Sequence, residues 1–258
     1  MELGIEGLRV LVTAGGAGIG REVARVFIEE GARVHVCDVD NAALDALGKS
    51  DPAITRSTAD VADRTQVKRL FSEALDALGG LDVLVNNAGI AGPTGRVEEI
   101  APEEWDRCIA VDLTGQFNCA RLAVPHLRKS HNASIINLSS IAGRLGFALR
   151  TPYSAAKWGV VGFTKSLAIE LGPDGIRVNA IQPGVVEGDR IDRVIAAKAK
   201  ARGVSFDEMR DSMLSVVSMR TTVTARQIAD QIVFLCSERG RTISGQAISI
   251  CGDAQMLA

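Results

Sequence analysis

Arg9-Val-Leu-Val-Thr13-Ala-Gly-Gly-Ala-Gly18-Ile-Gly20 is the stretch that decides the fold. It opens with a short β-branched run without polar alternation, which is typical of a strand buried on both faces of a parallel sheet. The glycines follow at once, and residues 19–30 then have the two-sided pattern of an amphipathic helix. A strand, a glycine turn and a helix in this order offer free backbone N–H groups and the positive end of a helix dipole, which predicts a dinucleotide pyrophosphate site.

The rest of the chain repeats this alternation of strand and helix. Further strands are predicted at residues 33–38, 54–59, 81–85, 133–138, 176–181 and 247–250. Such a pattern builds a doubly wound α/β fold, a Rossmann-like parallel sheet of about seven strands with helices on both faces. The short turns predict a single domain over residues 1–258. Residues 187–218 depart from the rhythm, with helices expected at 190–202 and 206–217.

The composition excludes several classes of protein. With 29 basic and 31 acidic residues among 258, the net charge is −2, and no nucleic-acid partner is expected. The N-terminus does not read as an export signal, and no run approaches the ~20 apolar residues of a spanning helix, so we expect no membrane association and a cytoplasmic location. The five cysteines and three histidines lack metal-ligand spacing, which predicts buried, reduced thiols and no metal.

A second stretch carries the candidate chemistry. Pro152 suits the first turn of a helix, and this places Tyr153 and Lys157 on one helix face, roughly 5–6 Å apart at Cβ. A free tyrosine loses its proton near pH ~10, too high for a base at neutral pH, but a nearby ammonium favours the phenolate. Ser140 precedes Tyr153 by 13 positions, and the intervening loop could fold its hydroxyl back towards the same point.

The run Thr13–Gly20, the run Asn86-Asn-Ala-Gly89 and the set Ser140, Tyr153 and Lys157 together resemble the short-chain dehydrogenase/reductase family, in order and spacing, over essentially the whole chain. The resemblance implies an oxidoreductase acting on the CH–OH group of a small-molecule substrate. Tyr153 would be the general acid/base, Lys157 would favour its phenolate and hold the ribose, and Ser140 would orient the substrate oxygen. It also implies a substrate lid at residues 187–218 and a homo-oligomer, commonly a tetramer.

Asp38 predicts the cofactor. It ends the second strand 18 residues after Gly20, where a carboxylate accepts hydrogen bonds from a ribose 2′-hydroxyl and repels a 2′-phosphate. NAD is therefore favoured over NADP. The alternative is that Asp38 merely caps the helix that starts near Asn41. The expected cofactor contacts are Thr13, Gly15, Gly18, Ile19, Gly20, Asp38, Asp60, Val61, Asn87, Ala88, Gly89, Tyr153, Lys157, Pro183, Gly184 and Val186.

The sequence departs from the family's pattern at three places. Ala14 stands where Gly is usual, a change expected to cost little if its φ is negative. Val185-Val186-Glu187-Gly188 replaces a Thr that often contacts the cofactor amide, so backbone groups would take over there. Asp112 stands where most members have Asn. Its main-chain role in holding a water linked to the lysine survives, but a carboxylate near Lys157 would disfavour the tyrosinate, so Asp112 joins the catalytic candidates.

The substrate stays open. We expect oxidation of a secondary alcohol, such as a polyol, a sugar-derived compound or a hydroxy acid. Arg144 and Arg150 flank the Ser140–Tyr153 loop and Arg190 opens the lid, which suggests an anionic substrate, although a solvated charged face explains them too. Three alternatives remain: a reductase of 3-oxoacyl thioesters on acyl carrier protein, a non-catalytic NAD sensor, and a methyltransferase, which Asp38 together with Tyr153 and Lys157 disfavours.

Overall fold

The seven strands form one parallel sheet. The computed structural model describes residues 2–257, without the side chain of Arg190. The strands are β1 (Arg9–Thr13), β2 (Arg33–Asp38), β3 (Thr55–Thr58), β4 (Val83–Asn86), β5 (Ser134–Leu138), β6 (Arg177–Pro183) and β7 (Ala247–Ile250). Their order across the sheet is β3-β2-β1-β4-β5-β6-β7. The predicted doubly wound sheet is confirmed. Successive strands are added outward from β1 towards β3 and then, on the other side, from β4 towards β7. Between β1 and β4, where this strand order reverses, such sheets open a ligand crevice at the carboxyl ends of the strands.

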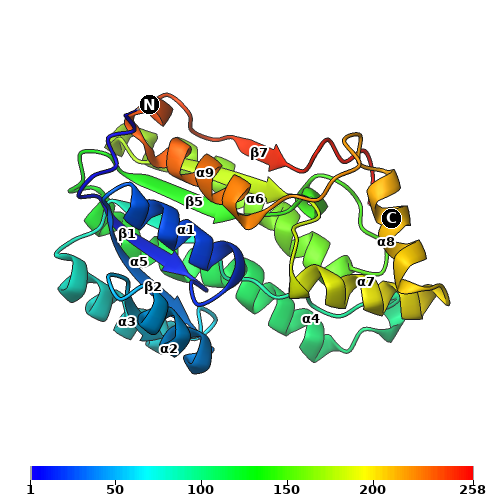
Figure 1. Cartoon of the computed structure of the whole chain (residues 1–258). Coiled ribbons are helices and arrows are strands. Elements are labelled where there is room, and N and C mark those ends of the chain that lie inside the picture. Colours follow the sequence, from blue (N-terminus) through cyan, green and yellow to red (C-terminus); the bar gives the residue numbers. More distant parts are fainter. Residues whose placement is uncertain (1, 258) are drawn as a thin grey trace.

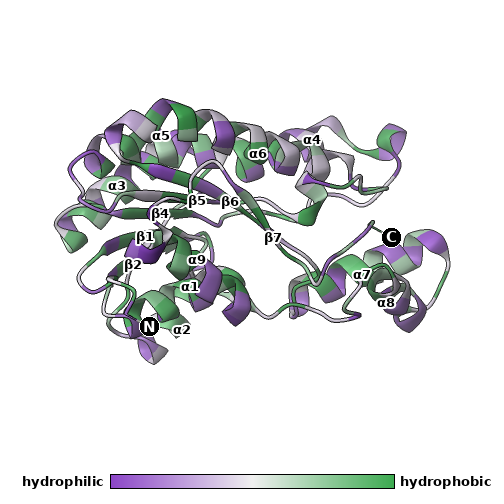
Figure 2. Cartoon of the chain, turned by 90° about the horizontal axis from the view of Figure 1, so that it is seen from above, coloured by the Kyte–Doolittle hydropathy of each residue, from purple (hydrophilic) through white to green (hydrophobic). Residues whose placement is uncertain are grey.

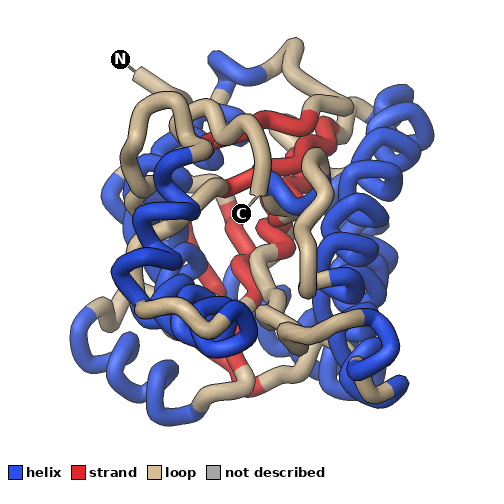
Figure 3. Tube along the Cα trace, turned by 90° about the vertical axis from the view of Figure 1, so that its right-hand side faces the viewer, coloured by secondary structure: helices blue, strands red, loops and turns tan. Residues whose placement is uncertain are grey.

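Helices cover both faces of this sheet (Figures 1 and 2). On one face lie α1 (Gly18–Glu29), α2 (Asn41–Ser50) and α9 (Ala225–Cys236), and on the other α3 (Arg64–Leu78), α5 (Gly115–Leu127) and α6 (Thr151–Leu171). Each layer has its own apolar cluster against the strands. Figure 3 shows the strands enclosed between the two helical layers. The five cysteines are buried and unbridged, as predicted.

The helical segment over residues 102–127 has an irregular centre. α4 (Pro102–Ile109) runs into a π-helical turn, Ala110–Thr114, and then into α5. Such turns carry one extra residue per turn and frequently mark functional sites. The bulge falls on the segment that contains Asp112.

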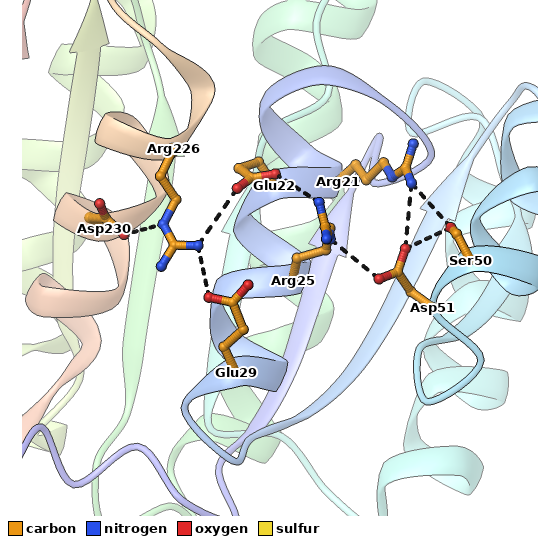
Figure 4. Close-up of polar contacts among 8 residues, drawn as sticks. All are labelled: Arg21, Glu22, Arg25, Glu29, Ser50, Asp51, Arg226 and Asp230. Atoms are coloured by element: carbon orange, nitrogen blue, oxygen red, sulfur yellow. Dashed lines mark hydrogen bonds and ion pairs between the residues drawn. The ribbon is translucent and has the colours of Figure 1, made fainter.

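Ion pairs join α9 to α1. Arg226 of α9 lies 2.7 Å from Glu29 and 3.8 Å from Glu22 of α1, and 2.8 Å from Asp230 on its own helix. Figure 4 shows how the network continues along α1 to the end of α2 through Arg21, Arg25, Ser50 and Asp51. These charges are partly exposed, so each pair adds little to stability. The apolar residues beneath them, which belong to the cluster on this face, carry the packing.

Residues 187–218 stand outside the two helical layers. α7 (Asp189–Arg202) and α8 (Phe206–Ser215) lie beyond the carboxyl end of the sheet (Figure 1) and enclose an apolar cluster of their own, which includes Ile195 and Met213. Bridges between Val186 and Val223 and between Val217 and Ala254 hold the two ends of the segment.

The α6 helix carries apolar residues beyond the side that faces the sheet. Trp158 is 51% and Ile169 80% exposed, and Phe117 of neighbouring α5 is 43% exposed. In the single chain these residues are left uncovered. No helix in the described residues is both long and apolar enough to cross a membrane.

Candidate active site

The helix α6 brings the phenol and the amine together. It begins at Thr151 with Pro152 in its first turn, and the Lys157 ammonium lies 5.5 Å from the centre of the Tyr153 ring. Lys157 is 3% exposed, and its Nζ donates a hydrogen bond to the Leu138 carbonyl at 3.0 Å. A positive charge is thus held beside a half-buried phenol.

Asp112 supplies the negative charge of this site. It is fully buried in the π-helical turn, with Oδ2 3.4 Å from Lys157 Nζ. Its Oδ1 accepts the backbone N–H of Ile90 at 2.6 Å, and its main-chain carbonyl accepts the Gln116 side chain at 3.2 Å. Asp112 therefore connects the loop after β4 to Lys157 through its side chain, in addition to any main-chain role.

Ser140 lies in a turn packed against the same part of α6. Its Oγ accepts the N–H of Ala142 at 3.1 Å and so caps the 3₁₀ turn Ile141–Gly143. The neighbouring Ser139 hydroxyl donates to the Lys157 carbonyl at 2.8 Å, and a Cβ on Gly143 would lie 2.5 Å from that carbonyl. The accepted N–H leaves the Ser140 hydroxyl hydrogen available for another acceptor.

The turn between β1 and α1 fits a dinucleotide. Gly18 has φ +54, and no described atom lies within 4 Å of a Cβ placed there, so the backbone is open to a ligand. Gly15 and Gly20 serve close packing instead, since a Cβ would lie 2.5 Å from Val36 and 2.2 Å from the Ala14 carbonyl, respectively. Open N–H groups at a helix start are what a pyrophosphate requires.

Asp38 holds this turn from the end of β2. Its Oδ2 accepts the N–H of Gly16 at 3.0 Å, and Oδ1 accepts that of Asp40 at 3.1 Å. The N-cap of α2 is Asp40, whose carboxylate accepts the first free N–H groups of the helix. The alternative role of Asp38 as the cap of that helix is therefore wrong.

The backbone of Ala14 does not have the negative φ under which Ala in place of Gly was expected to cost little. Its φ is +51, in the left-handed region that glycine favours. The condition of a negative φ is not met, because the chain must turn sharply here for Gly15 to pack under Val36. The backbone accordingly carries strain at this position.

Thr13 and Asn87 bind each other. The Thr13 hydroxyl oxygen accepts the N–H groups of Asn87 and Ala88, both at 3.0 Å, and the Asn87 side-chain amide donates to the carbonyls of Thr13 and Ala14 at 2.9 and 3.0 Å. These bonds fix the carboxyl ends of β1 and β4 relative to each other. Both residues shape the crevice between the two strands.

Several other expected cofactor residues have structural partners. The Asp60 carboxylate forms an ion pair with Arg107 at 2.9 Å, and Val61 is buried against Gly115. Gly184 donates its N–H to the Ile250 carbonyl at 2.9 Å. Of the other three, Ile19 lies in the first turn of α1, Pro183 ends β6, and Val186 follows that strand.

Of the arginines expected near the substrate, Arg144 and Arg150 are not brought together. Arg150 is 2% exposed, donates to the Ala91 carbonyl, and has its guanidinium 5.1 Å from the centre of the Tyr153 ring. Arg144 instead donates to the Ala254 carbonyl at 2.8 Å and is exposed. The Arg190 side chain lies outside the described part of the chain.

A pocket of about 430 Å³ adjoins these groups. Its walls are the loop after β4 from Gly89 to Thr94, Arg150, and the α7 residues Arg193, Val194 and Ala197. A Cβ on Gly89 would lie 3.2 Å from Lys157 Nζ, so this wall residue lies next to the lysine. It is thus placed to hold a small molecule beside the phenol.

The chain is similar to known proteins over almost its whole length. Residues 13–252 match a family model described as enoyl-(acyl carrier protein) reductase. The 3-oxoacyl-[acyl-carrier-protein] reductase FabG of Thermotoga maritima is 35% identical over 256 residues, which cover 96% of this chain and 98% of that protein. The uncharacterized oxidoreductase YxbG of Bacillus subtilis is 34% identical, covering 96% and 91%.

Two solved structures are also similar. Levodione reductase has a TM-score of 0.89 and 28% identity, covering 97% of both chains. A variant of actinorhodin polyketide ketoreductase, solved with NADPH, has a TM-score of 0.90 and 32% identity, covering 95% of this chain and 96% of that one. This chain belongs to the short-chain dehydrogenase/reductase family. It is an oxidoreductase of a family that binds a nicotinamide cofactor.

Three residues of this short-chain dehydrogenase/reductase site were not predicted. Gln116 links the Asp112 carbonyl to that of Leu138, and Arg193 lines the pocket. Lys198 is fully buried, with Nζ 4.2 Å from the centre of the Phe147 ring. Lys198 interrupts the apolar stripe of its helix, and a charged residue at such a position could have indicated from the sequence that this lysine is buried. Gln116 and Arg193 occupy unremarkable positions in their helices.

Proposed function

We propose that this chain is a NAD-dependent oxidoreductase that transfers a hydride between nicotinamide and a secondary alcohol or its ketone. The observation that carries the proposal is the buried Lys157 ammonium 5.5 Å from the Tyr153 ring. A non-catalytic NAD sensor has no use for a phenol beside a buried cation, whereas proton transfer at a carbinol oxygen requires one.

The nicotinamide, when bound, accepts or supplies the hydride. Tyr153 takes the hydroxyl proton of the alcohol in oxidation and returns it to the ketone oxygen in reduction. Lys157 stabilises the phenolate by its charge and is held in place by Leu138 and Asp112. Ser140 donates its hydroxyl hydrogen to the substrate oxygen, since its own lone pair is engaged by Ala142.

The proposed cofactor is NAD because of the charge at the end of β2. The Asp38 carboxylate accepts the N–H of Gly16 in the glycine turn and stays partly exposed. A carboxylate at this place would repel a 2′-phosphate. The arginines of α1, Arg21 and Arg25, both pair with Asp51. The ketoreductase structure with NADPH argues in the other direction. The ratio of kcat/KM for NADH over NADPH decides: Asp38→Ser should lower it at least tenfold, and the exposed Asp45→Ser should not.

Two substrate classes remain as candidates. The first is a polyol, sugar-derived or hydroxy-acid alcohol. The second is a 3-oxoacyl thioester carried on acyl carrier protein, and the comparisons favour it over the first, because FabG proteins of Thermotoga maritima and Staphylococcus aureus are both 35% identical to this chain. Rates of NADH formation with a panel of alcohols, and of NADH consumption with 3-oxoacyl thioesters, separate the two.

Tyr153→Phe tests the reaction itself. It removes the transferable proton and should reduce turnover at least ~10²-fold with the cofactor affinity largely kept. Turnover within a few-fold of the wild type would overturn the catalytic assignment. Cofactor binding, measured by NADH fluorescence, provides the check that the site is intact.

The assembly and the lid are proposals as well. We propose residues 187–218 as a lid, and a homo-oligomer, expected to be a tetramer, that covers the exposed apolar residues Phe117, Trp158 and Ile169. Sedimentation of Trp158→Glu should show a smaller species than the wild type, and equal sizes would contradict the interface. The five unbridged thiols favour the proposed cytoplasmic location.

A further inference from the structure

The side-chain amide of Gln116 shares a hydrogen-bond acceptor with Lys157. Gln116 is the second residue of α5 and is 2% exposed. Its Nε2 donates to the Leu138 carbonyl at 3.1 Å, and the same carbonyl accepts Lys157 Nζ at 3.0 Å. Nε2 also donates to the carbonyl of Asp112 at 3.2 Å, and the carboxylate of Asp112 lies 3.4 Å from Lys157 Nζ. One side chain therefore holds two residues that contact the Lys157 ammonium.

The chemistry of these partners fixes the orientation of the Gln116 amide. Carbonyl oxygens only accept hydrogen bonds, so the nitrogen of the amide faces them and its oxygen points elsewhere. That oxygen is buried and has no hydrogen-bond partner among the described residues, which is unfavourable. An apolar side chain of the same length would fill the space without this cost. The two bonds to carbonyls are what the amide contributes at this position.

These two bonds tie the π-helical turn to the sheet. The N–H of Gly115 bonds the Ala110 carbonyl five residues back, so the regular four-residue ladder of the helix is interrupted here. The bond from Gln116 to Asp112 adds a tie within this irregular turn, and the bond to Leu138 anchors the turn to the end of β5. The spacing of the two residues that contact the ammonium thus depends on Gln116.

We propose that Gln116 is a positioning residue that directs the Lys157 ammonium towards the Tyr153 phenol. This inference rests on the proposed function, in which Lys157 acts on that phenol. The ammonium lies 5.5 Å from the centre of the Tyr153 ring and acts on it through its charge, so the effect depends on where the ammonium is held. A misplacement of about 1 Å in an active site can lower a rate about 10²-fold.

Gln116→Met tests this role, because methionine keeps the length of the side chain and has no N–H to donate. With NAD saturating, kcat for alcohol oxidation should fall at least about tenfold. KM for the alcohol should change by less than about threefold, since the lost contact is not one with the alcohol. Gln116→Asn keeps the amide one methylene short of its acceptors and should act in the same direction, which covers a Gln116→Met protein that does not fold.

The same substitution in a Lys157→Met background shows whether Gln116 acts through Lys157. There it should lower kcat less than about twofold, because two residues that act through one group are not additive. Ser57→Ala is the control: it removes a buried hydrogen bond to His35 on the edge strand β3, and it should lower stability without changing kcat. Crystal structures of the wild type and Gln116→Met should show Lys157 Nζ displaced from Leu138 or Asp112 in the variant.

An unchanged kcat in Gln116→Met, or an equal loss in both backgrounds, would overturn the proposal. An ammonium that keeps its place in the crystal structure of the variant would overturn it as well, whatever the rates. Wild-type turnover by Lys157→Met would instead contradict the proposed function. A displaced ammonium in Gln116→Met would in that case still support the positioning of Lys157 by Gln116.

Discussion

Replacing Asp112 by Asn tests how the buried charges set the pH dependence of oxidation. The change keeps the size of the side chain and an oxygen for the Ile90 N–H, and it removes one negative charge 3.4 Å from Lys157 Nζ. Lys157 keeps the Leu138 carbonyl as a partner. The positive charge then acts on the phenol with less opposition, so the oxidation rate should rise at lower pH than in the wild type.

The size of this effect follows from two distances. Asp112 Oδ2 is 3.4 Å and the Tyr153 ring centre 5.5 Å from the same Lys157 nitrogen, so carboxylate and ring are at most about 9 Å apart. At an effective dielectric constant of about 20, two unit charges at that distance interact by about 1.8 kcal/mol. Removing the carboxylate removes this interaction, so the alkaline rise of the oxidation rate should move to lower pH.

The assay is kcat/KM for alcohol oxidation across the pH range, with NAD saturating. Asp106→Asn makes the same change in net charge on the exposed side of α4 and should leave the profile in place. Superimposable profiles for Asp112→Asn and the wild type, with both proteins folded, would refute the electrostatic reasoning. A shift to higher pH would show that Asp112 acts mainly by positioning Lys157.

Two further predictions concern stability. Ala14→Gly should raise the free energy of unfolding by about 0.5–1 kcal/mol in urea titrations, because relief of the left-handed φ outweighs the added freedom of the unfolded chain. The control, Ala46→Gly within α2, should lower the free energy of unfolding by about 1 kcal/mol. A loss of stability at both positions would contradict the strain at Ala14. Burial lowers the pKa of His35 to about 4, against a smaller opposing effect of Glu73, so the unfolded chain takes up this proton first as the pH falls. The stability that the neutral His35 contributes to the folded state, up to about 3 kcal/mol, is complete above pH ~6.5 and lost by pH ~4. His35→Gln should flatten that part of the stability curve, and an equally steep curve would show that other groups cause it.

The fold could be predicted because every level of the sequence agrees on it. The β-branched run before Thr13 and the glycines after it specify strand, turn and helix locally, and the same alternation recurs through β7. Tyr153 and Lys157 were predictable for a similar reason, since four residues along a helix set their spacing without reference to the rest of the chain.

The features that escaped prediction depend on contacts distant in sequence. The positive φ of Ala14 follows from how Gly15 packs against Val36 of another strand, and the cap of α2 shifts to Asp40 because Asp38 is engaged by the glycine turn. Lys198 and Phe147 are about fifty residues apart in the sequence, and nothing in the sequence around either residue indicates their contact. Hydrophobic periodicity indicates which face of a helix or strand is buried, but it does not indicate which residues pack against that face.

The double acceptance at the Thr13 hydroxyl has a consequence for cofactor association. One oxygen receives the N–H groups of Asn87 and Ala88, and the Asn87 side-chain amide donates to two carbonyls at the end of the neighbouring strand. The spacing of the two strand ends is therefore set by bonds within the protein. A dinucleotide that binds between them should spend little of its affinity on ordering this part of the backbone.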